Sequence, residues 1–382
     1  MTLPTIKGDQ PVILPGQTIG IIGGGQLGRM MAIAARYMGY RIIVLDPTPN
    51  CPTGQVADDQ IVAAYDDMSA IRELTRLSDV VTYEFENVDL KAAAYIENKG
   101  KLPQGTRALD ITQNRQHEKE LMVAEQLPVP KFHIVRDGTE LEKAMKDMTY
   151  PAVLKTCRGG YDGKGQIKLE SITDAPLGVD FVNENGLCIL EAWVPFEKEV
   201  SVVFSRAHSG DMAFFPIAEN DHKDHILYKT TVPAQITQSV YDDAIVAART
   251  LAESLSVIGT FAIEMFVTED GVLINEMAPR PHNSGHYTIE ACNISQFTQH
   301  IRAICNLPLE NVELLQPAVM VNILGEDMSQ AVEHLQTKQS GYVHLYGKDE
   351  AKVKRKMGHV TFIAPTAEKV KQLATNYQEA KQ

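Results

Sequence analysis

A strand-like run that ends in Lys155 leads into a loop in which glycines are interspersed with a second lysine, Lys164. This density of glycine lets successive backbone N–H groups converge on phosphate oxygens, while the two lysines offer positive charge to the same anion. The pattern G-x-x-x-x-G-K-[ST] is absent, so the segment is not a P-loop. We interpret it as a flexible phosphate-binding loop; the alternative is an ordinary glycine-rich hairpin. Its glycines are Gly159, Gly160, Gly163 and Gly165.

Residues 261–279 contain two apolar, strand-like runs joined by Glu-Asp-Gly, which predicts a β-hairpin with a three-residue turn. With Thr268 placed opposite Val272, Glu264 comes to lie directly opposite Glu276 on one face of the hairpin. Like charges at opposite positions destabilise a strand pair, so this arrangement calls for a cation between the two carboxylates. We expect magnesium, because Mg²⁺ prefers carboxylate oxygens together with ligand phosphates.

The two glutamates also have a simpler interpretation as charges on a solvated hairpin face, which their apolar neighbours disfavour. Strict alternation along the strand points Asn275 to the face opposite Glu276. Two further carboxylates, Glu191 at the end of one strand-like run and Glu199 at the start of the next, lie where a nucleotide would be held. Each of them could equally be a surface charge at a strand end.

Gly23, Gly25 and Gly28 follow a strand-like run and open a helical one, and Asp46 closes the next strand. This arrangement matches the dinucleotide fingerprint and, taken alone, favours an NAD-dependent dehydrogenase. The glycines only secure a tight turn and a close backbone approach at a helix N-terminus, where any anion can dock. A phosphate ligand other than a dinucleotide, or no ligand, fits equally well.

The composition bounds the class of protein. A chain of 382 residues is long for a single hydrophobic core, and we expect three domains. The net charge of −13 argues against a general nucleic-acid binder or a protein of anionic membranes. Five scattered cysteines without a C-x-x-C pair suit a reducing compartment, and no run predicts a signal peptide or a membrane span. A soluble, cytoplasmic protein is expected.

The elements that must position these residues fall into three units. Alternating strands and helices in residues 1–112 predict a parallel α/β, Rossmann-like domain. Residues 113–315 mix short strands with helices and predict an α+β middle domain that includes the glycine loop. Residues 316–382 form a small C-terminal domain, with a strand-like run at 319–324 and a basic cluster at 352–356.

Together, the lysine strand, the glycine loop, the strand-end carboxylates and the two-glutamate hairpin resemble the ATP-grasp superfamily. Within it the sequence looks like the N5-carboxyaminoimidazole ribonucleotide synthases of purine biosynthesis, and the likeness runs from Thr18 into the C-terminal domain. The resemblance implies an ATP-grasp fold, α/β and α+β, with an N-terminal pre-ATP-grasp domain and a small C-terminal domain. The motifs that carry it are GGGQLGRM at 23–30, YEFEN at 83–87, GYDGKGQ at 160–166 and NEMAPRPHNSGH at 275–286.

The resemblance also implies roles for individual residues, although none is carried over to Cys157. ATP would be bound by Arg115, Lys155, Gly160, Tyr161, Asp162, Gly163, Lys164, Gly165, Gln166, Glu191, Ala192, Trp193, Val194, Glu199, His222, Asn275 and Glu276. Magnesium would be held by Glu264 and Glu276. The ribonucleotide and bicarbonate would contact Tyr161, Asp162, Lys164, Arg280, His282, Asn283 and Ser284, with Lys348 and Arg355 on the 5′-phosphate and Gln26 or Glu84 near the ring.

The implied reaction needs ATP, because bicarbonate is a poor electrophile and the amine of aminoimidazole ribonucleotide is a poor nucleophile. Phosphorylation of bicarbonate, held by Arg280, would give carboxyphosphate, and the amine would attack it or the CO2 released from it. The glycine loop, with Lys164, would close as a lid that excludes water. Asp162 or His282 would accept the amine proton. The resemblance further implies ATP and Mg²⁺ as cofactors and a homodimer.

Three other functions remain to be weighed. The nearest is another ATP-grasp ligase, such as a formate-dependent formylation enzyme for glycinamide ribonucleotide. The run RPHNSGH at 280–286 disfavours this alternative. A dehydrogenase and a non-catalytic nucleotide-binding regulator are further alternatives, and intact carboxylates at 264 and 276 argue against the regulator. His282 and His286 could also form part of a zinc site, but the sequence offers no obvious third ligand.

Overall fold

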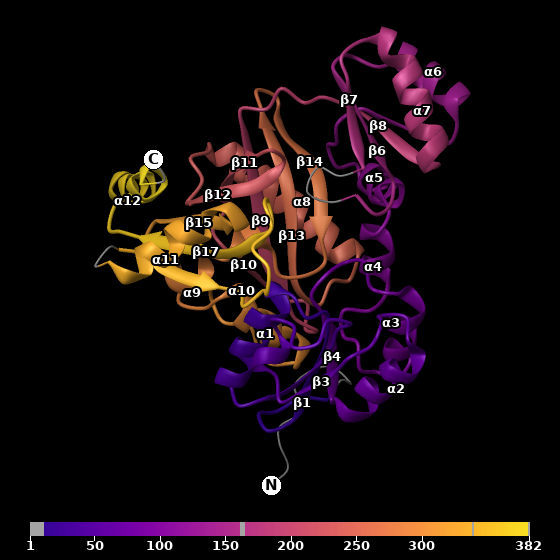
Figure 1. Ribbon diagram of the computed structural model, residues 1–382. Helices are drawn as coiled ribbons and strands as arrows, with labels where there is room; N and C mark the ends of the chain where they lie inside the picture. The colour runs from indigo at the N-terminus through magenta and orange to yellow at the C-terminus, as the bar shows by residue number, and fades with distance from the viewer. Residues whose placement is uncertain (1–10, 161–164, 338–339, 381–382) are drawn as a thin grey trace.

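The N-terminal part of the chain is a parallel α/β unit, as its alternating pattern predicts (Figure 1). Its strands are hydrogen-bonded in the order β3-β2-β1-β4, and all pairs are parallel. Apolar side chains pack on both faces of the sheet, against α1 on one face and α2 and α3 on the other. The elements are β1 (Thr18–Ile22), α1 (Gln26–Tyr37), β2 (Arg41–Leu45), β3 (Asp59–Ile61), α2 (Met68–Leu77), β4 (Val80–Tyr83), α3 (Leu90–Glu97) and α4 (Arg107–Thr112).

The computed structural model describes residues 11–160, 165–337 and 340–380. Beyond α4, a small antiparallel sheet of order β5-β8-β6-β7 carries Lys155 and Glu191. Helices α6 and α7 cover it, and Figure 1 shows this unit standing apart from the rest at the upper right. The elements are α5 (Arg115–Ala124), β5 (Phe132–Val135), α6 (Gly138–Lys146), β6 (Ala152–Thr156), β7 (Gln166–Leu169), α7 (Ala175–Asn185) and β8 (Cys188–Ala192).

A nine-stranded sheet occupies the centre of the molecule and carries the predicted glutamate hairpin (Figure 1). Helix α8 packs on one face, while α10 packs between this sheet and α1 and so joins the N-terminal unit to it. The elements are β9 (Lys198–Arg206), β10 (Met212–Phe214), β11 (Ala218–Lys223), β12 (Ile226–Val232), α8 (Gln238–Ser254), β13 (Gly259–Thr268), β14 (Gly271–Ala278), α9 (Thr288–Ala291) and α10 (Gln296–Ile304).

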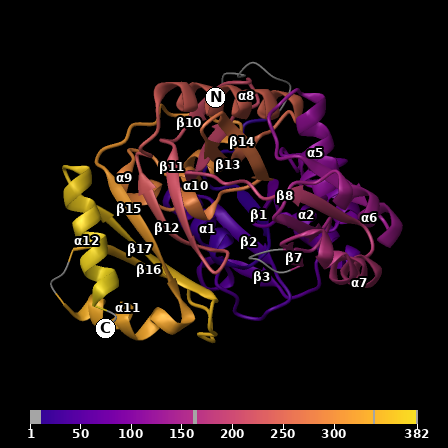
Figure 2. The ribbon, with the colours of Figure 1, turned by 90° about the horizontal axis from the view of Figure 1, so that it is seen from above.

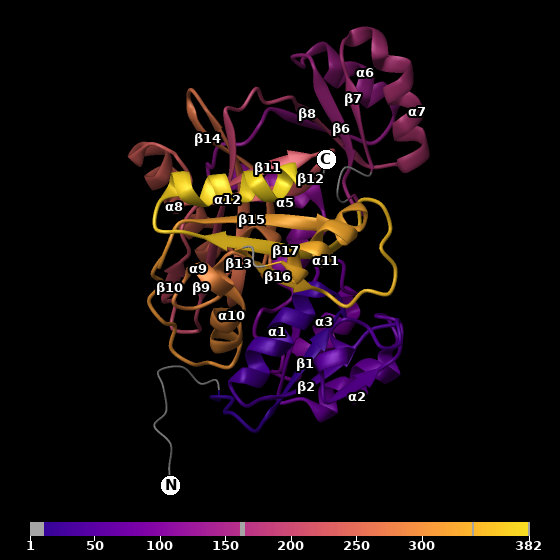
Figure 3. The same ribbon diagram turned by 60° about the vertical axis from the view of Figure 1, so that its left-hand side comes forward.

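The C-terminal strands extend this same sheet, in the order β12-β15-β17-β16, through an antiparallel pairing in which Lys229 lies opposite Val321. The sheet therefore crosses the domain boundary that the sequence suggests at residue 316. Helix α12 lies across β15 and β17, as Figures 2 and 3 show from two sides. The elements are β15 (Ala318–Leu324), α11 (Met328–Gln336), β16 (Tyr342–Leu345), β17 (Lys356–Ile363) and α12 (Ala367–Glu379). Within the described ranges, no helix combines the length and apolar character that crossing a bilayer requires.

Candidate active site

A cavity of about 1100 Å³ opens where the N-terminal unit, the small sheet, the central sheet and the loop before β17 meet. Most of the residues that the sequence assigns to a site line this one cavity, although they are spread over more than 300 positions of the chain. They are Gln26, Glu84, Arg115, Lys155, Gly160, Gln166, Glu191, Ala192, Trp193, Val194, Glu199, His222, Glu264, Asn275, Glu276, Arg280, His282, Asn283, Lys348 and Arg355.

The other predicted site residues have different positions. Ser284 lies in the short 3-10 helix η3 (Asn283–Gly285), fully buried beneath His282 rather than in the cavity wall. Gly165 ends the glycine loop with φ +69°, a left-handed conformation that suits glycine, and it also lies outside the lining. The remaining predicted residues, Tyr161, Asp162, Gly163 and Lys164, fall outside the described residues.

The hairpin that carries Glu264 and Glu276 has the predicted pairing but not the predicted turn. Thr268 lies opposite Gly271, so the turn has two residues rather than three, and the expected pairing of Thr268 with Val272 is wrong. A β-bulge between Glu264 and Met265 then shifts the register by one residue and restores Glu264 to its place opposite Glu276.

The bulge also explains the position of Asn275. No residue of β13 is paired with Asn275, which is the extra residue of the bulge, between Glu276 and Ile274. Strict alternation predicts that its side chain points away from that of Glu276, yet both residues line the cavity. An extra residue in one strand breaks the alternation of side chains, so two successive residues can face the same space.

Two lysines, the buried Lys119 and the partly buried Lys155, neutralise Glu191. Lys155 Nζ lies 2.6 Å from Glu191 Oε2, and Lys119 Nζ lies 3.1 Å from Oε1. Burial alone would raise the pKa of Glu191, but the two ammonium groups outweigh it and hold the pKa well below its ordinary value. Lys119 also donates to the carbonyl of Asn275 at 2.8 Å and so ties α5 to β14. The sequence offered no sign of this role, because Lys119 belongs to a helix rich in charged residues.

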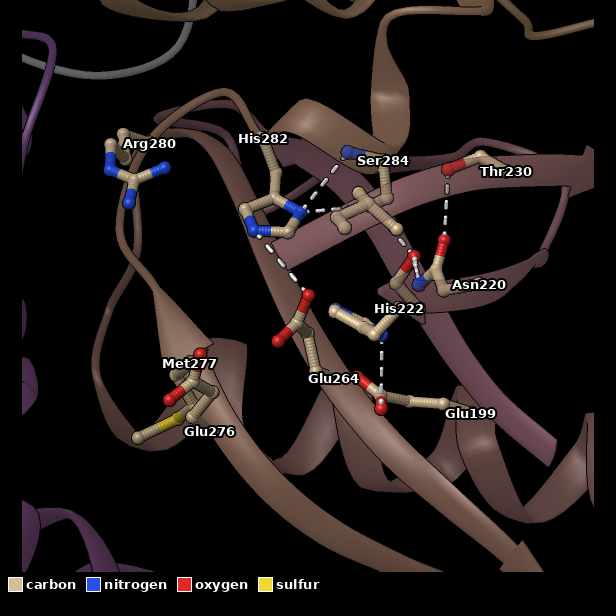
Figure 4. Close-up of polar contacts among 12 residues, drawn as sticks. Glu199, Asn220, His222, Thr230, Glu264, Glu276, Met277, Arg280, His282 and Ser284 are labelled. Carbon is tan, nitrogen blue, oxygen red and sulfur yellow. Dashed lines mark hydrogen bonds and ion pairs between the residues drawn. The ribbon is translucent and has the colours of Figure 1, made fainter. Parts of the chain in front are cut away.

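The carboxylates of Glu199, Glu264 and Glu276 lie close together near this lysine pair (Figure 4). Glu276 is paired with Arg115 at 3.1 Å, and although burial raises its pKa, Arg115 and Lys155 lower the pKa to about 2. Burial and the charge of Glu276 raise the pKa of Glu199 to about 8. Burial, Glu276 and Glu199 raise the pKa of Glu264 well above its ordinary value. Without a ligand, Glu199 therefore keeps its proton at neutral pH, and the pKa of Glu264 is shifted in the same direction.

These shifts predict how the stability of the ligand-free protein depends on pH. Between pH 4.5 and about 8, folded Glu199 keeps a proton that the unfolded chain has already lost. The free energy of unfolding should therefore fall as pH rises through this window. Urea unfolding at pH 5.5 and pH 8 would measure the difference, and Glu199→Gln should reduce it. Equal pH dependence in the wild type and the variant would contradict the assignment.

Arg280 and His282 approach the cavity from the segment after β14 (Figure 4). Arg280 Nε lies 2.6 Å from Glu86 Oε2, and despite burial this carboxylate raises the pKa of the guanidinium. His282 Nε2 lies 3.5 Å from Glu264 Oε1, and burial followed by the charge of Arg280 lowers the pKa of His282 to about 3. Glu86 was not among the predicted site residues, although it belongs to the YEFEN motif.

The glycine turn after β1 is closed to a dinucleotide by the protein's own carboxylates. The Glu84 carboxylate accepts hydrogen bonds from the backbone N–H groups of Gly25 and Gly28, and Asp46 Oδ2 accepts one from Gly24 N at 2.7 Å. These donors, at the N-terminus of α1, are the ones that would otherwise bind a pyrophosphate. The glycine turn therefore binds the carboxylate of Glu84 in the cavity wall, where a dinucleotide-binding protein would bind a pyrophosphate.

A basic loop also lines the cavity and leads into β17, which lies on the other side of the hairpin β13–β14 from β6 and β8 (Figure 1). Its lining residues are Lys348 and residues 352–356, and the last of them, Lys356, begins β17. Lys348 Nζ donates to the carbonyl of Lys356 at 2.7 Å, and Arg355 NH1 donates to the carbonyl of Glu350 at 2.9 Å. These bonds fix the shape of the loop. Its lysine and arginine side chains bring positive charge to the cavity of a chain whose net charge is −13.

Comparison with known proteins supports the fold and the family that the sequence resembles. The ribonucleotide synthetase preATP-grasp domain matches residues 16–113, the ATP-grasp domain matches 120–297, and the phosphoribosylaminoimidazole carboxylase C-terminal domain matches 318–373. The N5-carboxyaminoimidazole ribonucleotide synthase of Bacillus subtilis (strain 168) is 47% identical over 366 residues, which cover 96% of each chain.

Solved structures agree with this relationship. A crystal structure of the ADP complex of an N5-carboxyaminoimidazole ribonucleotide synthetase is 53% identical, with a TM-score of 0.93 over 96% of this chain and 98% of that one. The N5-carboxyaminoimidazole synthase of Aspergillus clavatus in complex with ADP and 5-aminoimidazole ribonucleotide is 31% identical, with a TM-score of 0.88 over 95% and 98% of the two chains. The chain therefore belongs to the N5-carboxyaminoimidazole ribonucleotide synthase family, ATP-grasp ligases that carboxylate aminoimidazole ribonucleotide in purine biosynthesis.

Proposed function

We propose that this chain carries out its family's reaction in the cavity described above, with bicarbonate as the carboxyl donor and carboxyphosphate as the intermediate. The observation that carries the proposal is the order of charges along the cavity. The small sheet that carries Lys155 and Glu191 lies on one side of the hairpin β13–β14, and β17, which the basic loop precedes, lies on the other side (Figure 1). This arrangement suits a nucleoside triphosphate bound on one side and a second, phosphorylated substrate bound on the other.

The carboxylates fit a magnesium ion. Ligand atoms of Glu199, His222 and Glu264 lie within 4.8 Å of one another, and Glu276 lies opposite Glu264 across the hairpin. Burial together with this crowding of negative charge favours protons on Glu199 and Glu264, and a divalent cation would replace them. We assign Glu264 and Glu276 as the ligands. Bound Mg²⁺ would neutralise charge that develops on the β- and γ-phosphates.

Phosphoryl transfer then needs position and positive charge from the protein. A bicarbonate oxygen attacks the γ-phosphorus in line, the bond from that phosphorus to the bridging oxygen breaks, and ADP leaves. Arg115 lies 3.1 Å from Glu276, and Lys155 lowers the pKa of the same carboxylate, so we assign both cations to the phosphates of ATP. We assign Arg280 to bicarbonate, because its guanidinium is held in the wall by Glu86.

Carbon–nitrogen bond formation follows. The exocyclic amine of aminoimidazole ribonucleotide attacks the carboxyl carbon of carboxyphosphate, phosphate departs with the electron pair of the carbon–oxygen bond, and the amine loses a proton. Carboxyphosphate hydrolyses readily, so an enclosed cavity protects it.

The proposal places the ribonucleotide between Arg280 and the basic loop, near Gln26 and Glu84. It also includes a cytoplasmic homodimer, as the family resemblance implies.

An assay of ADP release with different acceptors tests the proposal. ADP release should require aminoimidazole ribonucleotide and rise with added bicarbonate, while NAD(P)H absorbance stays flat with every substrate. Glycinamide ribonucleotide with formate serves as the control for the nearest alternative ligase. Full activity with that pair, or a hydride-transfer signal, would contradict the proposal.

A further inference from the structure

Behind His282 lies a file of four buried polar side chains that the reaction above does not use. Thr230 on β12, Asn220 on β11 and Ser201 on β9 come from three neighbouring strands, and Ser284 comes from η3. Asn220 is 5% exposed, and the other three are fully buried. Figure 4 shows the file running from Thr230 to the ring of His282. Buried hydroxyls and amides this close to a reacting centre need an explanation beyond packing.

The hydrogen bonds of the file run in one direction. Thr230 Oγ1 donates to Asn220 Oδ1 at 3.0 Å, and Asn220 Nδ2 donates to Ser201 Oγ at 3.0 Å. Ser201 Oγ donates to Ser284 Oγ at 2.7 Å, and Ser284 Oγ lies 2.8 Å from His282 Nδ1. A serine hydroxyl has a single hydrogen. Because Ser284 accepts from Ser201, its own hydrogen is available for His282 Nδ1.

A second contact indicates independently that His282 Nδ1 is the acceptor at this end of the file. The backbone N–H of Ser284 is 3.4 Å from His282 Nδ1, where the histidine caps η3, and a backbone N–H can only donate. His282 Nδ1 therefore accepts and carries no proton. In a neutral imidazole the proton then lies on Nε2, the atom that faces Glu264. Gln296 clamps the backbone of His282, accepting from its N–H at 2.9 Å and donating to its carbonyl at 2.7 Å.

We infer that Ser284, Ser201, Asn220 and Thr230 are positioning residues that hold His282 as the tautomer protonated on Nε2. His282 then serves the reaction as a hydrogen-bond donor through Nε2, on the side where Glu264 lies, and it is not the group that accepts the amine proton. The inference rests on the proposed function for the reaction that His282 assists, but not for the tautomer itself.

Kinetics of matched serine variants test the role of the file. Ser284→Ala should lower kcat roughly tenfold, as expected for the loss of one orienting hydrogen bond, and leave the KM for ATP unchanged. Ser205→Ala is the control, because Ser205 is a fully buried serine of the same strand as Ser201 whose hydroxyl bonds Thr260 Oγ1 at 2.7 Å. It should keep the wild-type kcat. In a His282→Ala background, Ser284→Ala should have no further effect, because the file acts through the histidine.

Ring-nitrogen NMR of His282 in the ligand-free protein tests the tautomer without any assumption about the reaction. The wild type should show an unprotonated Nδ1 and a protonated Nε2, and Ser284→Ala should mix the two tautomers. A protonated Nδ1 in the wild type would overturn the inference. So would a Ser284→Ala enzyme with wild-type kcat, or an equal loss of kcat from Ser284→Ala with and without His282. Failure of the carboxylation assay would overturn the proposed function and leave the tautomer result standing.

Discussion

Glu276→Gln is expected to lower the rate of ADP release by roughly two to three orders of magnitude, a loss typical of removing one group that stabilises developing charge. The reason is that the substitution removes a proposed magnesium ligand and also the partner of Arg115, at 3.1 Å. Steady-state rates across a magnesium titration would measure the loss. Glu269→Gln removes the same charge from the exposed turn of the same hairpin and should leave the rate unchanged.

The two carboxylates of the hairpin should differ in their effect on stability. The pKa of Glu276 is lowered to about 2, so its charged form is favoured in the folded protein, and Glu276→Gln should destabilise the ligand-free protein. The pKa of Glu264 is raised by burial and by its neighbours, so Glu264→Gln should stabilise the ligand-free protein while also reducing turnover. If both variants keep wild-type rates at saturating magnesium, the assignment of the metal ligands is wrong.

Arg355→Ala is expected to raise the apparent KM for aminoimidazole ribonucleotide by roughly 10- to 100-fold, corresponding to the loss of charge-assisted hydrogen bonds to phosphate. Arg355 lines the cavity from the loop before β17, whereas Lys155 lies on β6 of the small sheet. The loop of Arg355 is held in shape by the bond from Lys348 to the Lys356 carbonyl. The planar guanidinium can make two parallel bonds to phosphate oxygens, whereas lysine offers a point charge. Arg355→Lys should therefore recover only part of the loss.

The separation of the two substrates gives the control for this experiment. ATP affinity, measured by nucleotide titration, should stay near the wild-type value in Arg355→Ala, because Lys155 and Arg115 lie in other elements. Lys352 is paired with Glu350 at 2.8 Å in the same loop, and Lys352→Ala should have a much smaller effect on the ribonucleotide KM. An unchanged ribonucleotide KM in Arg355→Ala, or equal weakening of both substrates, would contradict the role of Arg355.

The sequence was sufficient to predict a nucleotide site because its key residues belong to local patterns. Lys155 ends a strand-like run, and Glu264 and Glu276 lie in one hairpin. The opposition of Glu264 and Glu276 was predicted correctly from a wrong premise, since the two-residue turn and the bulge each shift the register by one and cancel. A bulge depends on packing against other strands, so residue alternation alone cannot predict it. For the same reason the shared orientation of Asn275 and Glu276 toward the cavity could not be predicted.

Long-range contacts account for what the sequence could not show. The glycine fingerprint looked like a dinucleotide site because the pattern specifies a turn, whereas the N–H groups of Gly25 and Gly28 bind Glu84, which is 59 and 56 positions away. Lys119 and Glu86 are important through partners on distant elements, at Glu191 and Arg280. The file behind His282 joins residues of three strands and η3, so no local pattern marks it.

The continuity of the central sheet into β15 and β17 gives the cavity two walls of different kinds. The hairpin with Glu264 and the loop with Arg355 belong to one framework of paired strands, so their spacing is set by backbone hydrogen bonds. Lys155 and Glu191 belong to a separate small sheet. The distance between the hairpin and the basic loop is therefore fixed in the acceptor half of the cavity. We expect this fixed distance to select a molecule in which the amine and the phosphate have a matching separation. Within the described residues, the nucleotide half is not joined to that framework by strand pairing, so we expect its distance from the acceptor half to be less strictly fixed.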